Sequence, residues 1–133
     1  MKLKKPKEFT IDRSKWVQGG YENNGELLGF SELLNDEGNM CCLGFYSKAC
    51  GVHEDGLLGQ YTPAELQDQQ VPYMTVNGCS SPFASDLMKL NDNSNNYRYN
   101  EVHKRDKEKL IKEKFKLIDV KVKFVGQYPK GVV

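Results

Sequence analysis

The chain has 133 residues, of which 38% are hydrophobic, 28% charged and 11% aromatic. This length predicts a single domain over residues 1–133 that buries about two thirds of the surface of its unfolded chain. No apolar run approaches the roughly 20 residues of a membrane span, which excludes a membrane protein, and no apolar stretch of a secretory signal follows the basic first residues. We therefore expect a cytoplasmic protein with a loose basic arm at residues 1–7 and a loose tail at residues 127–133.

The net charge of +1 conceals a strong segregation along the chain. Residues 1–17 carry six basic and two acidic side chains, residues 18–97 carry two and eleven, and residues 98–133 carry eleven and five. Such a field steers partners toward a protein, although a solvated lysine-rich helix beside acidic loops gives the same pattern. Nucleic acid is not strongly indicated, because only three basic residues are the arginines that base-edge and phosphate recognition favour.

A short strand is the first predicted element, because Phe9 and Ile11 alternate with polar neighbours. A helical turn around Trp16 is expected to follow it. Asp12 or Ser14 can cap this turn, since both side chains accept backbone N–H groups.

Residues 21–29 show no clear period and predict a loop. Residues 33–40 contain Asn-Asp-Glu-Gly, which suits a type I turn with glycine in the left-handed position and predicts a tight hairpin. From Cys42 to Cys50 the apolar residues recur at helical spacing, and Gly51 supplies a C-terminal cap. The sequence therefore predicts a helix with one buried face over this stretch.

Two further helix starts carry explicit capping signals. Thr62 opens a capping box with proline at the first helical position, and Ser81 precedes a second helix over residues 83–90 in the same manner. Residues 91–96 are almost wholly Asn, Asp and Ser, which predicts a loop.

A charged helix over residues 101–116 and an alternating strand over residues 118–124 are predicted to close an α+β domain. We expect a small, mostly antiparallel sheet formed by the segments near Phe9, Leu33, Met40 and Val122. Helices are expected to cover one face of this sheet, around Phe45, Leu87 and Ile111. Pairing of the terminal strands would gather a basic pole of Lys4, Lys5, Lys7, Lys121 and Lys123.

Several short blocks carry a family resemblance. One is Met-Cys-Cys-Leu-Gly-Phe at residues 40–45, and a later one is Leu-Met-Lys-Leu-Asn-Asp at residues 87–92. Ala-Cys-Gly, Leu-Leu-Gly and Thr-Pro-Ala-Glu-Leu lie between them, at residues 49–51, 57–59 and 62–66. With these blocks the chain resembles, over roughly residues 9–125, a family of small uncharacterised bacteriophage proteins. The resemblance implies a phage origin and an accessory role in the cytoplasm of an infected bacterium, and it brings no established catalytic or binding residues.

Zinc is one chemistry to weigh, since the chain has four cysteines and two histidines. The spacing argues against a zinc site, because there is no Cys-x2-Cys pair and both Cys42 and Cys50 fall on the apolar face of the predicted helix. Thiols also stay reduced in a cytoplasm. We therefore expect free core cysteines, no metal and no cofactor.

A nucleophilic cysteine is the enzyme hypothesis. Cys41 lies at the start of the predicted helix, where the helix dipole lowers a thiol pKa, and His53 or His103 could act as its base. Neither histidine lies in a recognisable catalytic signature, because His103 belongs to a charged helix and His53 to an acidic loop. The favoured expectation is that the protein is not an enzyme.

Two polar blocks could line a pocket for a small ligand. Asn91 and Asp92 supply donors and acceptors that could hold a polar ligand together with amides near Cys41, or they could simply end a helix. Arg13 beside Trp16 suits a phosphate and a stacked base, although Trp16 could equally be a core anchor.

Three functions follow from these features. The favoured one is a non-enzymatic phage-type protein that binds a host protein, such as a component of antiviral defence, and inhibits it. The second is a sequestering module for a nucleotide-like signal, with possible homo-oligomerisation. The third is a cysteine-dependent enzyme.

Overall fold

The computed structural model describes residues 3–18, 20–21, 27–29, 31–66, 69–92 and 104–128. The strands of this part of the chain are β1 (Glu8–Asp12), β2 (Gly20–Tyr21), β3 (Leu27–Gly29), β4 (Thr75–Val76), β5 (Cys79–Ser80) and β6 (Lys121–Val125). The α-helices are α1 (Cys42–Cys50), α2 (Glu54–Leu57), α3 (Pro82–Asp92) and α5 (Lys104–Lys116). Two short 3-10 helices are η1 (Arg13–Lys15) and η2 (Pro63–Glu65). In these described ranges, every helix is too short or too polar to cross a bilayer.

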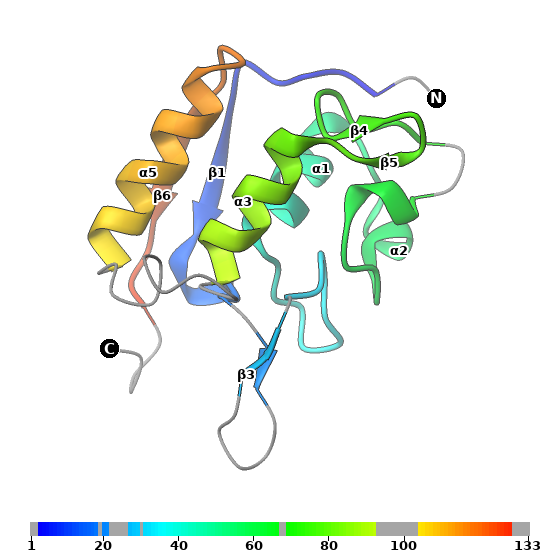
Figure 1. Ribbon diagram of the computed structural model, residues 1–133. Coiled ribbons are helices and arrows are strands. Elements are labelled where there is room, and N and C mark those ends of the chain that lie inside the picture. The colour runs from blue at the N-terminus through cyan, green and yellow to red at the C-terminus, as the bar shows by residue number, and fades with distance from the viewer. Residues whose placement is uncertain are drawn as a thin grey trace.

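The main sheet pairs the two terminal strands, β1 and β6, in parallel (Figure 1). Phe9 stands opposite Val122, and Ile11 stands opposite Phe124. The predicted pairing of the terminal strands is confirmed and the chain is α+β, but the prediction of a mostly antiparallel sheet is wrong for this pair. The helices all lie between the two strands in the chain, and such a crossover connection brings the chain back to the same end of the sheet. Within the described residues, antiparallel pairing is confined to β2–β3 and β4–β5.

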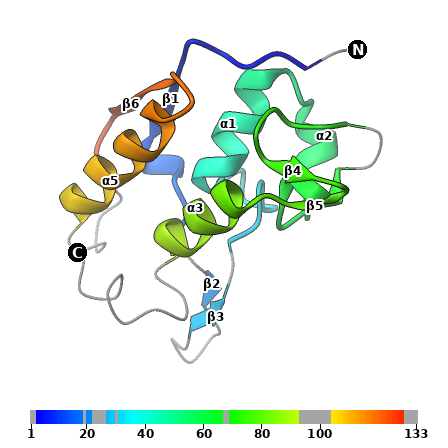
Figure 2. The same cartoon turned by 45° about the horizontal axis from the view of Figure 1, so that its top comes forward.

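The core lies between this strand pair and the helices α1, α3 and α5 (Figure 2). Phe9 and Ile11 of β1 are buried, while Thr10 between them is exposed. The ring centroid of Phe9 lies 5.6 Å from that of Tyr46 in α1 and 4.9 Å from that of Phe115 in α5, both edge-on. Such aromatic pairs contribute about 0.5–1.5 kcal/mol each beyond the burial of their area. Phe9 therefore joins the sheet to two helices at once.

The turn predicted within residues 33–40 is present, but its arms do not form a hairpin. The side chain of Asn35 accepts two backbone N–H groups of the turn, and Gly38 takes a φ of +85°, which glycine adopts without strain. The arms instead form isolated parallel bridges with other segments, Leu34 with Leu58 and Met40 with Trp16. The local sequence thus specifies the turn, whereas the partners of its arms are chosen by the rest of the fold.

The prediction of a loop over residues 21–29 is wrong at both ends of this range. Gly20–Tyr21 pairs with Leu27–Gly29 in an irregular antiparallel ladder, and residues 22–26 lie outside the described residues. Strands of two and three residues are too short to show an alternating pattern in the sequence.

The predicted helix starts are confirmed. The helix α1 ends at Gly51 with a φ of +115°, and Thr62 closes a complete capping box with Glu65, although η2 extends for only one turn. Ser81 caps α3 by accepting the N–H of Ala84 at 3.1 Å.

The ends of the later elements differ from their predictions. The helix α3 continues through Asn91 and Asp92, which were expected to begin a loop, and residues 93–103 lie outside the described residues. The strand expected from residue 118 begins only at Lys121, because a turn with Asp119 at a φ of +60° intervenes.

Gly44 lies where the backbone of Leu33 crosses α1. A Cβ atom at Gly44 would lie 1.9 Å from the carbonyl oxygen of Leu33 and 3.1 Å from the Cβ of Met40. Backbone atoms cannot move away as a flexible side chain can, so the position accepts only glycine. The glycine of the Met-Cys-Cys-Leu-Gly block therefore has a packing role.

Residues 3–7, expected within a loose arm, are held against the body of the protein. The backbone N–H of Lys4 donates to the carbonyl of Cys50 at 3.0 Å, and the carbonyl of Lys7 accepts from the N–H of Lys121 at 2.9 Å. The bond between Lys7 and Lys121 continues the β1–β6 pairing toward the start of the chain, and the bond from Lys4 attaches this segment to the end of α1.

Candidate functional site

The buried side chain of Asn91 connects the two motif blocks. Its Oδ1 accepts a hydrogen bond from Nε1 of Trp16 at 2.7 Å and from the backbone N–H of Cys42 at 3.0 Å. Its Nδ2 donates to the carbonyl oxygen of Val17 at 3.0 Å. One amide thus joins the end of α3 to the start of α1 and to the segment after β1.

Asp92 extends this network toward Ser31. Its Oδ1 accepts from the Ser31 hydroxyl at 2.6 Å and from Nδ2 of Asn91 at 2.7 Å, and its Oδ2 accepts from the Ser31 backbone N–H at 3.0 Å. Burial raises the pKa of Asp92 above its ordinary value, because desolvation outweighs the hydrogen bonds from Ser31 and Asn91 and the nearby charge of Lys107.

Lys107 places a buried ammonium beside the network. The residue is 1% exposed, and its Nζ donates to Oε1 of Gln18 at 2.7 Å and to the carbonyl oxygen of Asn91 at 3.1 Å. A buried charge needs such partners. This role was not predictable from the sequence, because Lys107 stands in a run of charged residues that is typical of a solvated helix face.

Cys41 lies at the N-cap of α1, but it is buried. Burial raises the pKa of its thiol to about 12, and the charge of Asp92 adds to this effect, against the lowering influence of the amides of Gly44 and Leu43. The thiolate is the nucleophilic form of cysteine. The Cys41 thiol is therefore protonated and unreactive at neutral pH.

The other three cysteines and His53 differ in their exposure to solvent. Cys42 and Cys50 lie in the core as predicted, and Cys79 is exposed. His53 is an exposed residue that caps α2 by accepting the N–H of Asp55. His103 lies outside the described residues. Among the residues that the structure describes, no cluster of His, Cys, Asp or Glu has the arrangement of a metal site.

Arg13 is engaged by Glu108. The Nε and Nη2 atoms of Arg13 donate to the two carboxylate oxygens of Glu108, each at 2.8 Å, and Nη1 donates to the carbonyl of Gly126 at 2.9 Å. The hydroxyl of Tyr128 donates to Glu108 as well. The guanidinium carbon lies 5.9 Å from the ring centroids of both Phe124 and Tyr128. We call Arg13, Glu108 and Tyr128 the tail clasp, since they hold the chain that follows β6.

The structure brings Trp16, Asn91 and Asp92 together, with Cys41 beside them. Trp16 is 7% exposed and lies under the rings of Phe124 and Tyr128, at centroid distances of 5.2 Å and 6.2 Å. The polar atoms of this group, and those of Arg13, are bonded within the protein. A ligand placed here would have to break these bonds.

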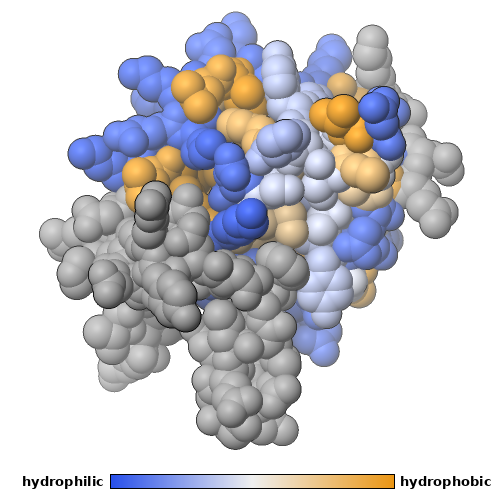
Figure 3. All heavy atoms as spheres, in the orientation of Figure 1, coloured by the Kyte–Doolittle hydropathy of each residue, from blue (hydrophilic) through white to orange (hydrophobic). Residues whose placement is uncertain are grey.

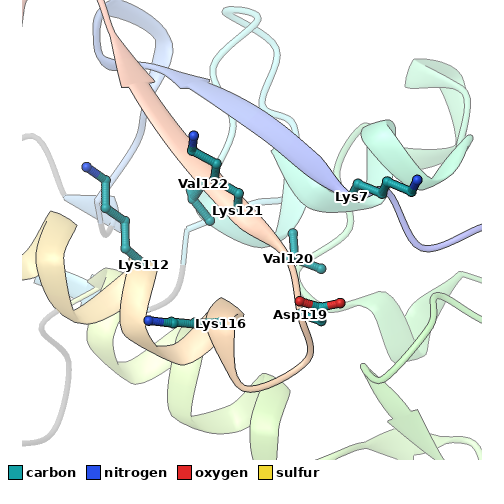
Figure 4. A pocket seen from close by; sticks show the side chains of 7 residues that line it. All are labelled: Lys7, Lys112, Lys116, Asp119, Val120, Lys121 and Val122. Carbon is teal, nitrogen blue, oxygen red and sulfur yellow. The ribbon is translucent and has the colours of Figure 1, made fainter.

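A basic hollow lies at the surface between α5 and the start of β6 (Figure 4). Its volume is about 390 Å³, and its lining residues are Lys7, Lys112, Lys116, Asp119, Val120, Lys121 and Val122. The described lining residues include four exposed lysines and one aspartate, whose formal charges sum to +3. In Figure 4, Lys112 and Lys116 project from α5, whereas Lys7 points away at the far edge of the strand pair.

The lysines expected to form a basic pole have different surroundings. Lys7 and Lys121 share the hollow, Nζ of Lys123 lies 3.5 Å from Oε2 of Glu8, and Nζ of Lys5 donates to the carbonyl of Ile118 at 2.7 Å. Lys4 is exposed.

Sequence reasoning missed the contribution of α5 to this surface. Lys112 and Lys116 are four residues apart, which places them on one helix face, and this spacing was the available signal. Figure 3 shows hydrophilic residues over the α5 side of the molecule, interrupted by small apolar patches.

A scan against protein-family models, a search of curated proteins and a search of solved structures each found no match to this chain.

Proposed function

We propose that this protein is a non-enzymatic binding protein of phage type that acts in the cytoplasm of an infected bacterium. It binds a host protein directly and inhibits it, and a component of antiviral defence is the target class that its phage resemblance suggests. The basic hollow is the observation that carries the proposal, because four exposed lysines against one acid attract an acidic partner surface and speed association.

The state of the cysteines supports binding rather than catalysis. Cys41 is the cysteine whose place at a helix start predicted a nucleophile. It is buried, and burial raises the pKa of its thiol to about 12. The side chains of Asn91 and Asp92 are hydrogen-bonded to other residues of the fold. The charged surface is thus the feature that is open to a partner.

Co-purification from bacterial cells tests the proposal. The Lys112→Glu, Lys116→Glu variant reverses two lysines of the hollow, and the Lys15→Glu, Lys89→Glu variant makes the same change in net charge at exposed positions elsewhere. The proposal predicts a host protein that the wild type and the second variant capture and the first does not. Equal capture by all three would contradict the proposed surface.

A sequestering module for a nucleotide-like signal is the second candidate, because the same hollow could hold phosphate groups. None of its described lining residues is aromatic, so they offer charge without a stacking platform for a base. Binding would raise the melting temperature in a nucleotide panel, and intact ligand would be released on denaturation. Both results together would favour this candidate over a protein partner.

A further inference from the structure

We propose that the free edge of β6 binds an extended acidic segment of the partner as a third strand of the sheet. The proposal rests on the protein-binding function above and names the kind of segment that would bind. An added strand gains affinity from backbone hydrogen bonds and gains selectivity from the side chains that flank the edge.

The backbone of β6 has one unpaired side in the described residues. The main sheet consists of β1 and β6 alone, so β6 pairs on one edge only. The N–H of Lys121 donates to the carbonyl of Lys7, within the β1 side of the ladder. Because backbone groups alternate in direction along a strand, those of Val122 and Phe124 point to the opposite, free edge.

Lysines flank this free edge from two elements. Lys121 and Lys123 are exposed on the outer face of β6, where the buried Val122 between them points inward. Lys112 approaches from α5, with Nζ 5.7 Å from the ring centroid of Phe124. Nζ of Lys123 lies 3.5 Å from Oε2 of Glu8 on β1. The charges offered to an added strand are therefore chiefly those of Lys121 on the outer face and Lys112 beside Phe124, and they select acidic side chains.

The free edge of β1 offers no such selection. The hollow beside it is lined by side chains of both signs, Lys15 and Lys48 against Glu8, Asp12 and Glu54. The charge of the two edges thus distinguishes them, and β6 is the edge that favours an acidic segment.

Lysines on an edge strand also discourage pairing between identical copies, because two such edges repel each other. That protection needs charges on the strand itself. It does not account for Lys112 and Lys116, which extend the positive surface from a neighbouring helix.

Binding of short peptides to the intact protein tests the proposal. The probe is a fluorescent peptide of alternating glutamate and threonine, capped at both ends and measured by anisotropy at low salt. Two N-methylated forms keep the charge of the parent. One carries methyl groups on alternate backbone nitrogens and retains hydrogen-bonding amides on one edge, whereas the other carries them on every backbone nitrogen and presents no amide N–H on either edge.

Strand addition predicts that the fully methylated form binds at least about tenfold more weakly than the parent, since it has no amide N–H to donate to β6. The alternately methylated form should bind nearly as well as the parent, because it can turn its unmethylated edge toward β6. Equal binding of all three peptides would show capture by charge alone and would overturn strand addition. Absence of binding by the parent peptide would overturn it as well. In either case, a host protein that still co-purifies through Lys112 and Lys116 would leave the proposed function standing.

Discussion

The side-chain oxygen of Asn91 accepts hydrogen bonds from both the indole N–H of Trp16, at 2.7 Å, and the backbone N–H of Cys42, at 3.0 Å. The Leu-Asn-Asp block and the Met-Cys-Cys-Leu-Gly block therefore meet at a single buried amide. Asn91 is 1% exposed, so each of these groups is satisfied without water. The two blocks form one structural unit that fixes the helices α1 and α3 relative to the end of β1.

Replacing Asn91 by leucine should strongly destabilise the fold. Leucine has a similar volume but leaves the Trp16 indole and the Cys42 amide without their acceptor, while the Val17 carbonyl keeps the hydrogen bond from the Ser31 hydroxyl at 3.3 Å. We expect the free energy of unfolding to fall by about 3 kcal/mol, since each unsatisfied buried group costs about 1–3 kcal/mol. Urea denaturation followed by the fluorescence of the single tryptophan measures this change.

The control for Asn91 is the exposed Lys89 of the same helix. Lys89→Ala should change stability by less than about 0.5 kcal/mol. A similar small change for Asn91→Leu would show that the network contributes little to the fold.

Gly44→Ala should be among the more damaging small substitutions. The added methyl group would lie 1.9 Å from the carbonyl oxygen of Leu33, so the turn segment and α1 must separate. We expect a loss of about 3 kcal/mol or more, as for severe overpacking.

Gly56→Ala provides the matched control. A Cβ there would meet only the side chain of Val52, at 3.6 Å, which is an ordinary contact. Its effect should stay within about 1 kcal/mol, because alanine also favours a helix. Equal losses for Gly44 and Gly56, measured by thermal unfolding, would contradict the proposed crossing of Leu33 over α1.

The tail clasp should make the free energy of unfolding depend on pH in the acid range. Burial acts to raise the pKa of Glu108, but the hydrogen bonds from Arg13 and Tyr128 outweigh it and hold the pKa below its ordinary value. The stability from this lowered pKa is present above the pKa of an unfolded glutamate and is lost as the pH falls through the native pKa. Glu108→Gln should cost about 2 kcal/mol at neutral pH and progressively less toward acid pH.

The raised pKa of Asp92 changes the free energy of unfolding with pH in the opposite direction. This higher pKa makes the native state bind the proton more tightly, so the contribution of Asp92 declines as the pH rises. The wild type and Glu108→Gln share this contribution, and it cancels in their difference. A difference in unfolding free energy that stays constant from neutral to acid pH would contradict the account of Glu108.

Thiol labelling of the native protein should detect one fast cysteine among the four. Cys79 is exposed, whereas Cys41, Cys42 and Cys50 are buried, and burial raises the thiol pKa of Cys41 to about 12 and of Cys50 to about 11. Cys79→Ser should remove the fast phase with an aromatic disulfide reagent, and Cys41→Ser should leave it unchanged. Fast labelling that disappears in Cys41→Ser would revive the nucleophile hypothesis.

Local signals in the sequence predicted the elements that local chemistry specifies. The capping box at Thr62, the glycine that ends α1 and the alternation of Phe9 and Ile11 each depend on near neighbours, and each was located correctly. The direction of β6 relative to β1 depends instead on the path of the whole chain. Periodicity contains no information about that path, which is why a mostly antiparallel sheet was expected.

The candidate site shows the same division. Asn91 and Asp92 stood out by composition, and a helix end was one of the two positions proposed for them, but their partners Trp16 and Ser31 lie 75 and 61 residues away in the sequence. Glu108 and Lys107 gave no signal, because paired or buried charges look in a sequence like solvated ones. Long-range pairing of polar groups is thus the part that the sequence alone did not reveal.

The central claim is tested most directly by the association rate between this protein and a host protein identified by the co-purification experiment. This rate should be measured at low and at physiological salt for the wild type, for Lys112→Glu, Lys116→Glu and for Lys15→Glu, Lys89→Glu. Charge steering through the basic hollow predicts that the first variant associates at least about tenfold more slowly than the wild type at low salt, whereas the second variant associates at the rate of the wild type. At physiological salt, the difference in association rate between the first variant and the wild type should become smaller. Equal rates for the two variants at low salt would contradict binding through this surface.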